Sequence, residues 1–288
     1  MNNNQSLSTL NAETVQTSYV EAGGIRFAYR KFGVESEVPL VFCQRFRGTM
    51  EDWDPALINE IAKERTVILF DNAGVGLSLG VTPNRVPEMA KYAITFIEAL
   101  ELKQVDILGF SMGGMVAQHV TLNRPDLVRR MILSATGPGA GEGIEGGREG
   151  VFEVMIKPVQ TEEDFLFMFF DKTETSKSLG REHLKRLTWR KEDRSPLVSS
   201  ETMKAQVEAI MKMVNPSEDD TTFPRLSEIK QPVLIANGNK DIMIPTINSY
   251  IMSQKIENAQ LIIYPDSGHG FLFQHSKSFA EQISIFLR

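Results

Sequence analysis

The chain has 288 residues, of which 42% are apolar and 24% are charged, and its formal net charge is −6. This composition suits a soluble globular protein with a large core. The acidic balance offers no broad basic surface, so nucleic acid is not an expected partner, and no apolar stretch reaches the ~20 residues that span a bilayer, so a membrane is not expected either.

A single cysteine, Cys43, excludes an intrachain disulfide and favours a reducing compartment. Residues 1–17 are polar and lack the basic start and apolar run of a secretory signal, so we expect a disordered leader and a cytoplasmic protein. The histidines and the cysteine show no metal-ligand spacing, so neither a metal nor another cofactor is expected. The sequence leaves a monomer and a homodimer open.

The first expected elements are two short strands, at 18–21 and 25–32, separated by Gly23 and Gly24 in the manner of a hairpin. Apolar strands then alternate with helices. We expect strands at 39–43, 66–70, 105–108 and 128–134, and helices at 53–62, 86–100 and 112–123. Short apolar strands without polar alternation are typical of a parallel sheet covered by helices on both faces, so the sequence predicts an α/β fold with a mostly parallel sheet.

The strand pattern stops between residues 137 and 223. This segment opens on a glycine-rich run and then carries helical patterns at 162–170, 181–191 and 199–214. Beyond it we expect strands at 233–237 and 261–264, and helices at 245–255 and 276–287. The sequence therefore predicts a core formed by residues 18–136 and 224–288, and a helical cap, residues 137–223, inserted after the sixth strand.

The pentapeptide Gly109-Phe110-Ser111-Met112-Gly113 lies between an expected strand and an expected helix. This G-x-S-x-G spacing is what a nucleophile elbow needs, because a serine in a sharp, strained turn requires neighbours two residues away that lack a side chain. The start of the following helix would direct free N–H groups at the serine oxygen. By itself the string is a weak signal, and a glycine-rich turn with an idle serine is the alternative.

An acyl-transfer serine needs a general base and an acid that orients the base. Asp241 follows the expected strand at 233–237, and His269 follows the expected strand at 261–264, so both belong to loops at the carboxyl edge of the sheet. The alternatives are an aspartate that only caps the next helix and a histidine exposed on a surface loop. The other histidines are expected to be packed or exposed without a catalytic role: His119, His183 and His275.

The chain order Ser111, Asp241, His269 is the order found in the α/β-hydrolase superfamily, which the chain resembles from about Val20 to its end. It looks most like the branch of esterases and cofactor-free haloperoxidases that carry a helical cap. This resemblance implies that the three side chains form a catalytic triad. Residues 71–76 also resemble the Asp-x-x-Gly-x-Gly loop of the family, which we interpret as structural.

The loop after the third strand resembles the His-Gly-x-x-Gly loop of the same family, which implies an oxyanion hole made by the backbone N–H groups of Phe46 and Met112. Gln44 and Arg45 replace the His-Gly pair. Gln44 can keep a hydrogen bond beneath the loop, whereas Arg45 stands where a positive φ would favour glycine. Arg45 and Arg47 either form surface ion pairs or meet a carboxylate or carbonyl of the substrate.

The expected activity is that of a serine hydrolase that cleaves a carboxylic ester or lactone, a small-molecule substrate, through an acyl-enzyme. Perhydrolysis, C–C bond hydrolysis, and amide or thioester cleavage are alternatives that use the same three side chains. A non-catalytic ligand receptor and a scaffold also remain open. Dehalogenases and epoxide hydrolases of this fold use an aspartate at the elbow, so Ser111 argues against both.

Aromatic side chains of the cap are candidates for the substrate pocket. We expect Phe165, Phe169 and Trp189 to line it together with Arg45, which predicts an apolar or aromatic substrate. The alternative is that the aromatic side chains form the cap's own core.

Overall fold

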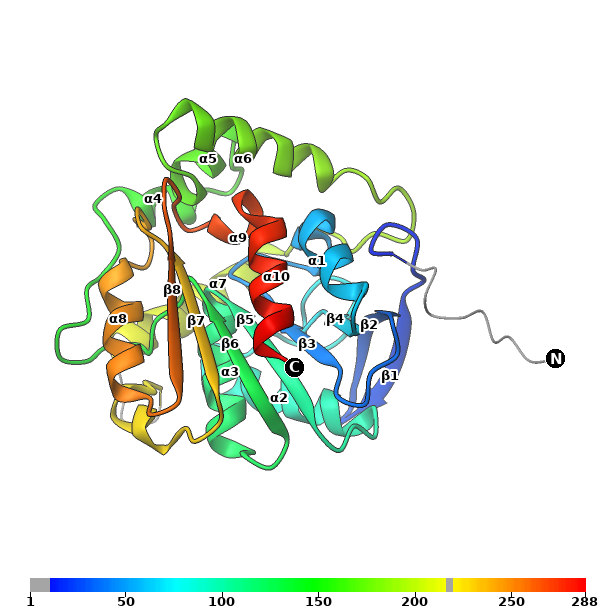
Figure 1. Cartoon of the computed structure of the whole chain (residues 1–288). Coiled ribbons are helices and arrows are strands. Elements are labelled where there is room, and N and C mark those ends of the chain that lie inside the picture. The colour runs from blue at the N-terminus through cyan, green and yellow to red at the C-terminus, as the bar shows by residue number, and fades with distance from the viewer. Residues whose placement is uncertain (1–10, 216–219) are drawn as a thin grey trace.

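The computed structural model describes residues 11–215 and 220–288. At its centre lies an eight-stranded sheet with the strand order β1-β2-β4-β3-β5-β6-β7-β8 (Figure 1). The strands are β1 Ser18–Ala22, β2 Ile25–Gly33, β3 Leu40–Cys43, β4 Thr66–Phe70, β5 Val105–Phe110, β6 Val128–Ser134, β7 Val233–Gly238 and β8 Ala259–Tyr264. β2 pairs antiparallel with β1 and β4, and the other neighbours pair parallel, which confirms the predicted hairpin and the mostly parallel sheet.

Helices cover both faces of this sheet. The core helices are α1 Pro55–Ala62, α2 Val86–Ala99, α3 Met112–Asn123, α8 Thr246–Lys255, α9 Phe271–Gln274 and α10 Ser276–Phe286. In Figure 1, α1 and α10 lie side by side in front of the sheet, whereas α2 and α3 lie together behind it. The α/β architecture expected from the alternation of apolar strands and helices is therefore present.

Apolar burial holds the sheet and its helices together. Strands β3, β4, β5 and β7 are buried at every residue, which explains why their sequences lack polar alternation. Aromatic rings fill the space between the sheet and the helices behind it; Phe70 of β4 stacks on Phe96 of α2 with ring centroids 4.4 Å apart. The loops at the carboxyl ends of these strands thus start from a rigid frame.

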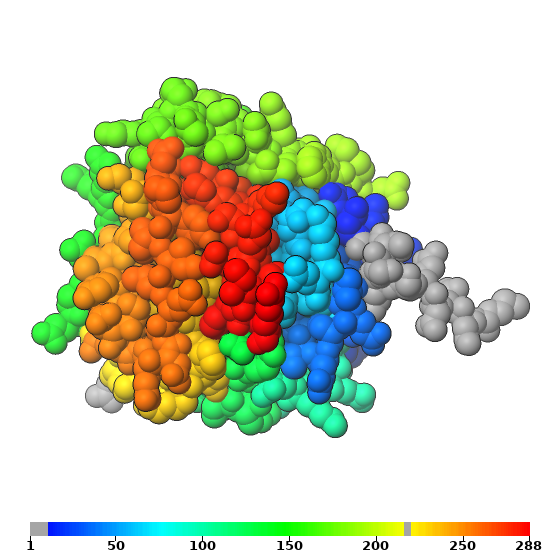
Figure 2. Space-filling model, in the orientation of Figure 1, coloured from blue at the N-terminus to red at the C-terminus, as the bar shows by residue number. Residues whose placement is uncertain are grey.

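Between β6 and β7 the chain forms a helical segment, which we call the cap. Its helices are α4 Val151–Met155, α5 Glu162–Phe169, α6 Glu174–Arg186 and α7 Ser200–Val214, and the 3-10 helix η3 Phe223–Glu228 leads back to the core. The described residues of this segment include no strand. α5 and α6 lie across the top of the molecule in Figure 1, and Figure 2 shows this green segment seated against the orange and red C-terminal part of the core.

Helix α6 begins earlier and ends earlier than the predicted segment at 181–191. Its start is set by Thr173, whose side chain accepts a hydrogen bond from the Ser176 N–H and so caps the first turn. Gly180 then lets the helix approach α5, because an added Cβ would collide with Leu166. The short helix α4 was not predicted from the sequence.

The sequence predicts a disordered leader at residues 1–17, of which residues 1–10 lie outside the described part of the chain. From residue 11 the structure corrects this expectation, because the chain packs against the body of the protein. Ala12 and Val15 are buried, and Arg190 of the cap donates hydrogen bonds to both of their carbonyl oxygens, at 3.1 and 2.8 Å. These bonds fasten the segment to the cap, and the Ala12 N–H, which donates to Asn59 Oδ1 at 2.9 Å, fastens it to the core.

Candidate active site

Ser111 forms the sharp turn between β5 and α3. Its backbone has φ 54° and ψ −122°, a conformation that residues other than glycine rarely adopt. The turn is held from both sides, since the Ser111 N–H donates to Ser134 O at 2.9 Å and Thr136 Oγ1 donates to Ser111 O at 2.7 Å. The predicted strained elbow is present in the structure.

The two glycines that flank the elbow leave room for close contacts. A Cβ on Gly109 would overlap the backbone of Gly113, and a Cβ on Gly113 would overlap the carbonyl oxygen of Cys43 at the end of β3. Strand β5, the start of α3 and the end of β3 therefore meet within van der Waals distance. No side chain caps the N-terminus of α3, so its first N–H groups are directed at the elbow.

Asp241 and His269 come together from two separate loops. Asp241 follows β7, His269 follows β8, and the His269 Nδ1 lies 2.8 Å from the Asp241 Oδ2. The Asp241 Oδ1 accepts hydrogen bonds from the N–H groups of Met243 and Ile244, at 2.8 and 3.0 Å. The carboxylate is thus fixed by the backbone, and it holds the imidazole with the proton on Nδ1.

The His269 side chain is buried, contrary to the alternative of a surface histidine. Its ring lies between Phe110 and Phe169, with centroids 5.1 and 5.4 Å away. Phe169 belongs to the cap, and its carbonyl oxygen accepts a hydrogen bond from the Gly270 N–H at 2.6 Å. The His269 Nε2 is buried without a hydrogen-bond partner among the described residues, so it is available to a ligand or substrate.

Ser111 and His269 line the same cavity, which holds about 280 Å³ of empty space including its mouth. The core and the cap both contribute to the wall. The other lining residues are Arg45, Phe46, Arg47, Met155, Gln160, Met168, Phe169 and Met243. A second cavity, about 460 Å³ on the same measure, shares Arg45 with the first and is bordered by Met112, Asp71 and Gln206 among others.

The loop after β3 is closed by Gln44. Its side-chain amide donates to Thr49 O at 2.9 Å, and its oxygen accepts from the Arg45 N–H at 2.8 Å. Gln44 therefore makes the hydrogen bonds beneath the loop that the sequence led us to expect. The left-handed position of the loop is not Arg45 but Arg47, with φ 57°.

Arg45 is mostly buried and is not a surface residue. It pairs with Asp52 at 2.6 Å, donates to Phe46 O at 2.8 Å, and places its guanidinium 5.1 Å from the ring centroid of Phe169. The ion pair with Asp52 neutralises its charge inside the protein. Arg45 thus forms a mostly buried ion pair and lines the cavity, and its contact with a substrate stays a prediction.

The structure separates the aromatic residues expected in the pocket. Phe169 lines the cavity, while Phe165 stacks behind Phe169 at 4.3 Å and is not among the lining residues. Trp189 is 50% exposed and is not a lining residue either, which corrects the prediction. The reason is that α6 ends at Arg186, so Trp189 lies on the turn beyond it at the surface.

His183, which the sequence predicts to be either packed or exposed, is buried in the structure. Its Nδ1 lies 2.8 Å from the Asp54 Oδ2, and its ring stacks on Phe273 with centroids 4.0 Å apart. Arg186 binds both oxygens of Asp54, at 2.8 and 2.7 Å. Burial lowers the pKa of His183. Burial would raise the pKa of Asp54, but the hydrogen bonds from His183 and Arg186 lower it below its usual value.

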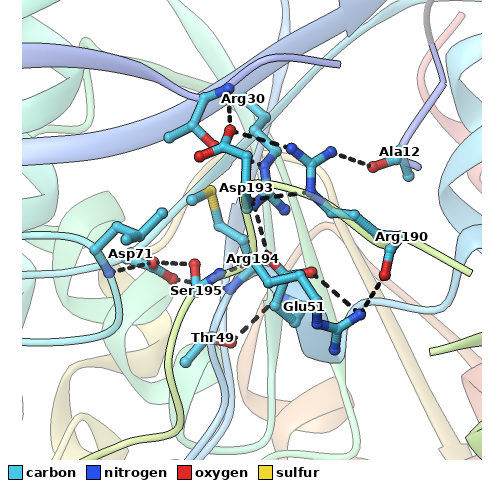
Figure 3. Close-up of polar contacts among 12 residues, drawn as sticks. Ala12, Arg30, Thr49, Glu51, Asp71, Arg190, Asp193, Arg194 and Ser195 are labelled. Carbon is cyan, nitrogen blue, oxygen red and sulfur yellow. Dashed lines mark hydrogen bonds and ion pairs between the residues drawn. The ribbon is translucent and has the colours of Figure 1, made fainter. Parts of the chain in front are cut away.

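A second group of buried charges joins the end of the cap to the core (Figure 3). Arg30 of β2 pairs with Glu51 at 2.6 Å and donates to the carbonyl oxygen of Asp193 at 2.7 Å. The Ser195 hydroxyl donates to Asp71 Oδ2 at 2.7 Å. Burial raises the pKa of Asp71 to about 6, in spite of the hydrogen bonds it accepts. Sequence reasoning missed both charged groups, since no local motif connects their members.

No helix among the described residues has both the length and the apolar character that a membrane span requires. Within the same residues, no cluster of three or more His, Cys, Asp or Glu side chains could hold a metal ion.

The sequence model of the alpha/beta hydrolase fold family matches residues 38–276, so this chain belongs to that family. An alpha/beta hydrolase fold protein from Chitinophaga pinensis is 36% identical and superposes with a TM-score of 0.86, covering 96% of this chain and 99% of that one. Both findings confirm the predicted α/β-hydrolase fold.

Curated relatives include hydrolases. The chain is 26% identical to a poly(3-hydroxyalkanoate) depolymerase of Ectopseudomonas oleovorans over 80% of its own length and 78% of that protein. It is also 26% identical to a 2-hydroxy-6-oxononadienedioate/2-hydroxy-6-oxononatrienedioate hydrolase of Escherichia coli O139:H28, over 77% of its own length and 76% of that protein. Together with family membership, these relatives support hydrolase activity.

Proposed function

We propose that this protein is a serine hydrolase that cleaves a carboxylic ester or lactone through an acyl-enzyme intermediate. The observation that supports the proposal most is the convergence of three loops. Ser111 occupies a strained elbow, and the buried His269, bound to Asp241 at 2.8 Å, lines the same cavity with an unpartnered Nε2. Nucleophilic acyl transfer also needs a hydrogen bond between the Ser111 hydroxyl and His269 Nε2, which this structure does not contain and which we expect to form when substrate is bound.

In the acylation step, His269 Nε2 takes the proton of the Ser111 hydroxyl while the oxygen attacks the acyl carbon. Asp241 keeps the other imidazole proton on Nδ1 and stabilises the positive charge that forms. The negative charge on the substrate oxygen is stabilised by the N–H groups of Phe46 and Met112. Each such donor contributes roughly 3 kcal/mol to the stability of the transition state.

The leaving alcohol takes its proton from His269. In the second step, His269 activates a water molecule, which attacks the acyl-enzyme and releases the acid. The apolar wall made by Phe169, Met155 and Met168 favours an apolar or aromatic acyl or alcohol group. The relative named as a poly(3-hydroxyalkanoate) depolymerase agrees with ester chemistry.

The relative named as a 2-hydroxy-6-oxo acid hydrolase supports C–C bond hydrolysis as the second candidate. The same serine and histidine would serve it, and the buried Arg45 beside the cavity could meet the acid group of such a substrate. The two candidates differ in the bond that is cleaved and not in the residues that cleave it. Substrate trials therefore have to separate them.

The test is a panel of esters and lactones of graded acyl length, together with a 2-hydroxy-6-oxo dienoic acid. Each is assayed with the wild type, with Ser111→Ala, and with Ser253→Ala on α8 as a matched control. We expect the best ester or lactone to be hydrolysed with Ser111→Ala reduced on the order of 10⁵–10⁶-fold in kcat, and Ser253→Ala unchanged. Wild-type turnover by Ser111→Ala would refute the triad. Preference for the dienoic acid would refute ester hydrolysis as the main activity and would leave the catalytic role of Ser111 unaffected.

A further inference from the structure

The cap is hydrogen-bonded to the loop after β3 at Arg47. The Arg47 N–H donates a hydrogen bond to the side-chain oxygen of Gln206, at 2.9 Å. Gln206 belongs to cap helix α7 and is buried, with 3% of its surface exposed. The two residues are 159 positions apart in the chain, so this contact exists only when the cap is seated.

The Arg47 side chain makes a second connection to the cap. Its guanidinium donates to Lys157 O at 2.6 Å, to Pro158 O at 3.2 Å and to Met155 O at 3.4 Å. These carbonyl groups lie at and just beyond the C-terminal end of α4, where a positive charge is favourable. Backbone and side chain of Arg47 are therefore both bound to cap residues.

Arg47 needs this support because of its conformation. Its φ of 57° places it in the left-handed region, which a residue with a Cβ occupies at a cost in energy. Such a conformation persists when surrounding contacts hold it. The turn hydrogen bond from the Gly48 N–H to Arg45 O, at 3.1 Å, supports this conformation from within the loop, and the cap contacts add to that support.

The neighbouring residue Phe46 lies between one anchor on the core and one on the cap. Arg45 is held on the core through Asp52, and Arg47 is held by Gln206 and the end of α4. We propose that Arg47 and Gln206 are positioning residues through which the seated cap sets the direction of the Phe46 N–H towards the oxyanion. This inference rests on the proposed function, in which that N–H stabilises the transition state.

The consequence is that binding and chemistry are coupled. A displaced cap would open the cavity and would also release the loop, so the oxyanion hole is complete only in the closed state. A structural role alone would not predict this coupling, since the cap is also fastened by Asp54 with His183 and Arg186, which do not contact the loop.

The first experiment compares Gln206→Leu, which removes the acceptor, with Gln206→Glu, which keeps one. The matched control is Glu208→Gln on the same helix, whose side chain binds Asn84 and makes no contact with the loop. We measure kcat and KM with a small activated ester, and the affinity of phenylboronic acid, whose tetrahedral adduct on Ser111 places an oxygen where the oxyanion forms.

We expect Gln206→Leu to lower kcat about 10–100-fold, less than the loss of a whole oxyanion donor, with KM within about 3-fold. Boronate affinity should fall by the same factor as kcat. Gln206→Glu should retain most activity, and Glu208→Gln should equal the wild type. Equal losses in Gln206→Leu and Glu208→Gln would overturn the inference, as would an unchanged boronate affinity or an unchanged kcat in Gln206→Leu.

A second pair of variants keeps the inference testable if Gln206→Leu does not fold. Arg47→Ala and Arg47→Gly both lose the guanidinium, but only glycine adopts the left-handed φ freely. We expect Arg47→Gly to be at least about 5-fold more active than Arg47→Ala in kcat. Equal activity would overturn the inference. Failure of the proposed function gives a different result. In that case the wild type would not bind boronate at Ser111, and Ser111→Ala would keep its turnover.

Discussion

The interior of the core is mainly apolar, whereas the contact between the cap and the core combines apolar packing with several buried charges. In the core, strands and helices meet through fully buried apolar side chains, such as the stacked pair Phe70 and Phe96. The cap packs on the core through apolar side chains such as Phe169, and buried charges fasten it further, with Asp54 between His183 and Arg186 at the centre of one group. Apolar burial does not depend on protonation, whereas a buried ion pair fails when one partner is removed or neutralised.

The residues proposed to catalyse the reaction therefore belong to one region, and many of those that control access to the cavity belong to the other. The proposed nucleophile, base and acid all lie on loops of the core, and the cap supplies part of the cavity wall and contacts the proposed oxyanion loop. Changes in the triad should therefore abolish turnover while the fold persists. Changes in the buried charges should loosen the cap while the core remains folded.

The largest effect is expected in the triad. His269→Gln should lower kcat on the order of 10⁵–10⁶-fold, because Ser111 loses the group that accepts its proton. The midpoint of thermal unfolding should shift by only a few degrees, since the site is held by apolar neighbours. Steady-state kinetics and a melting curve check both halves. A variant that unfolds at room temperature would break the separation between chemistry and fold.

The second largest effect is expected for the buried ion pair between Asp54 and Arg186, which joins the core to the cap. Asp54→Asn keeps the shape of the side chain but leaves Arg186 without a buried counter-charge, which costs about 3–5 kcal/mol in comparable pairs. We expect trypsin to cleave the cap much faster than in the wild type while the core fragments survive. Glu162→Gln, which removes a partner of Arg181 in an exposed ion pair, is the control and should change stability by less than about 1 kcal/mol. Simultaneous digestion of cap and core would contradict the comparison.

The pH dependence of the free energy of unfolding should reveal the protonation of Asp71, which contacts the cap through Ser195. Burial raises its pKa from the ordinary 3.8 to about 6, so the folded state binds a proton more tightly than the unfolded chain. The stabilisation is present below pH 4 and is lost as the pH rises through about 6, a change of about 3 kcal/mol.

Urea unfolding of the wild type and of Asp71→Asn at pH 4 and pH 7.5 measures this change. Relative to the variant, the wild type should be less stable at the higher pH by about that amount. A difference between the two proteins that does not vary with pH would show that Asp71 is ionised without penalty.

The smallest effect is expected for Trp189. Trp189→Ala should leave kcat/KM within about 2-fold and stability within about 0.5 kcal/mol, because half of the side chain is exposed and it does not line the cavity. Phe169→Ala, in contrast, removes a lining ring and should change the preference among acyl chain lengths by about 10-fold or more. The substrate panel measures both, and a larger effect of Trp189→Ala would show that the closed cavity extends to the surface of the cap.

The sequence predicted the features that depend on neighbouring residues. Ser111 could be found because the glycines that its turn requires lie two positions away, and Asp241 and His269 because each follows an apolar strand. The contacts that hold the cap could not be found in this way. His183 and Asp54 are 129 positions apart, and Arg47 and Gln206 are 159 positions apart, so no local pattern records either pair.

The pocket shows the same limit in another form. Phe165, Phe169 and Trp189 all appeared as large apolar side chains of the cap, but only the packing of α5 and α6 decides which of them faces the cavity. Helix α6 also begins at Glu174, directly after its N-cap residue Thr173, a start that the pattern at 181–191 did not reveal. Patterns along the chain thus predict elements better than the faces they bury.

Labelling with a fluorophosphonate, followed by peptide mapping, tests the central claim most directly. The account predicts one covalent adduct, on the Ser111 hydroxyl, that forms rapidly in the wild type, slowly in His269→Gln, and not at all in Ser111→Ala. An adduct on another side chain, or continued hydrolysis by a protein that the reagent leaves unlabelled, would contradict it.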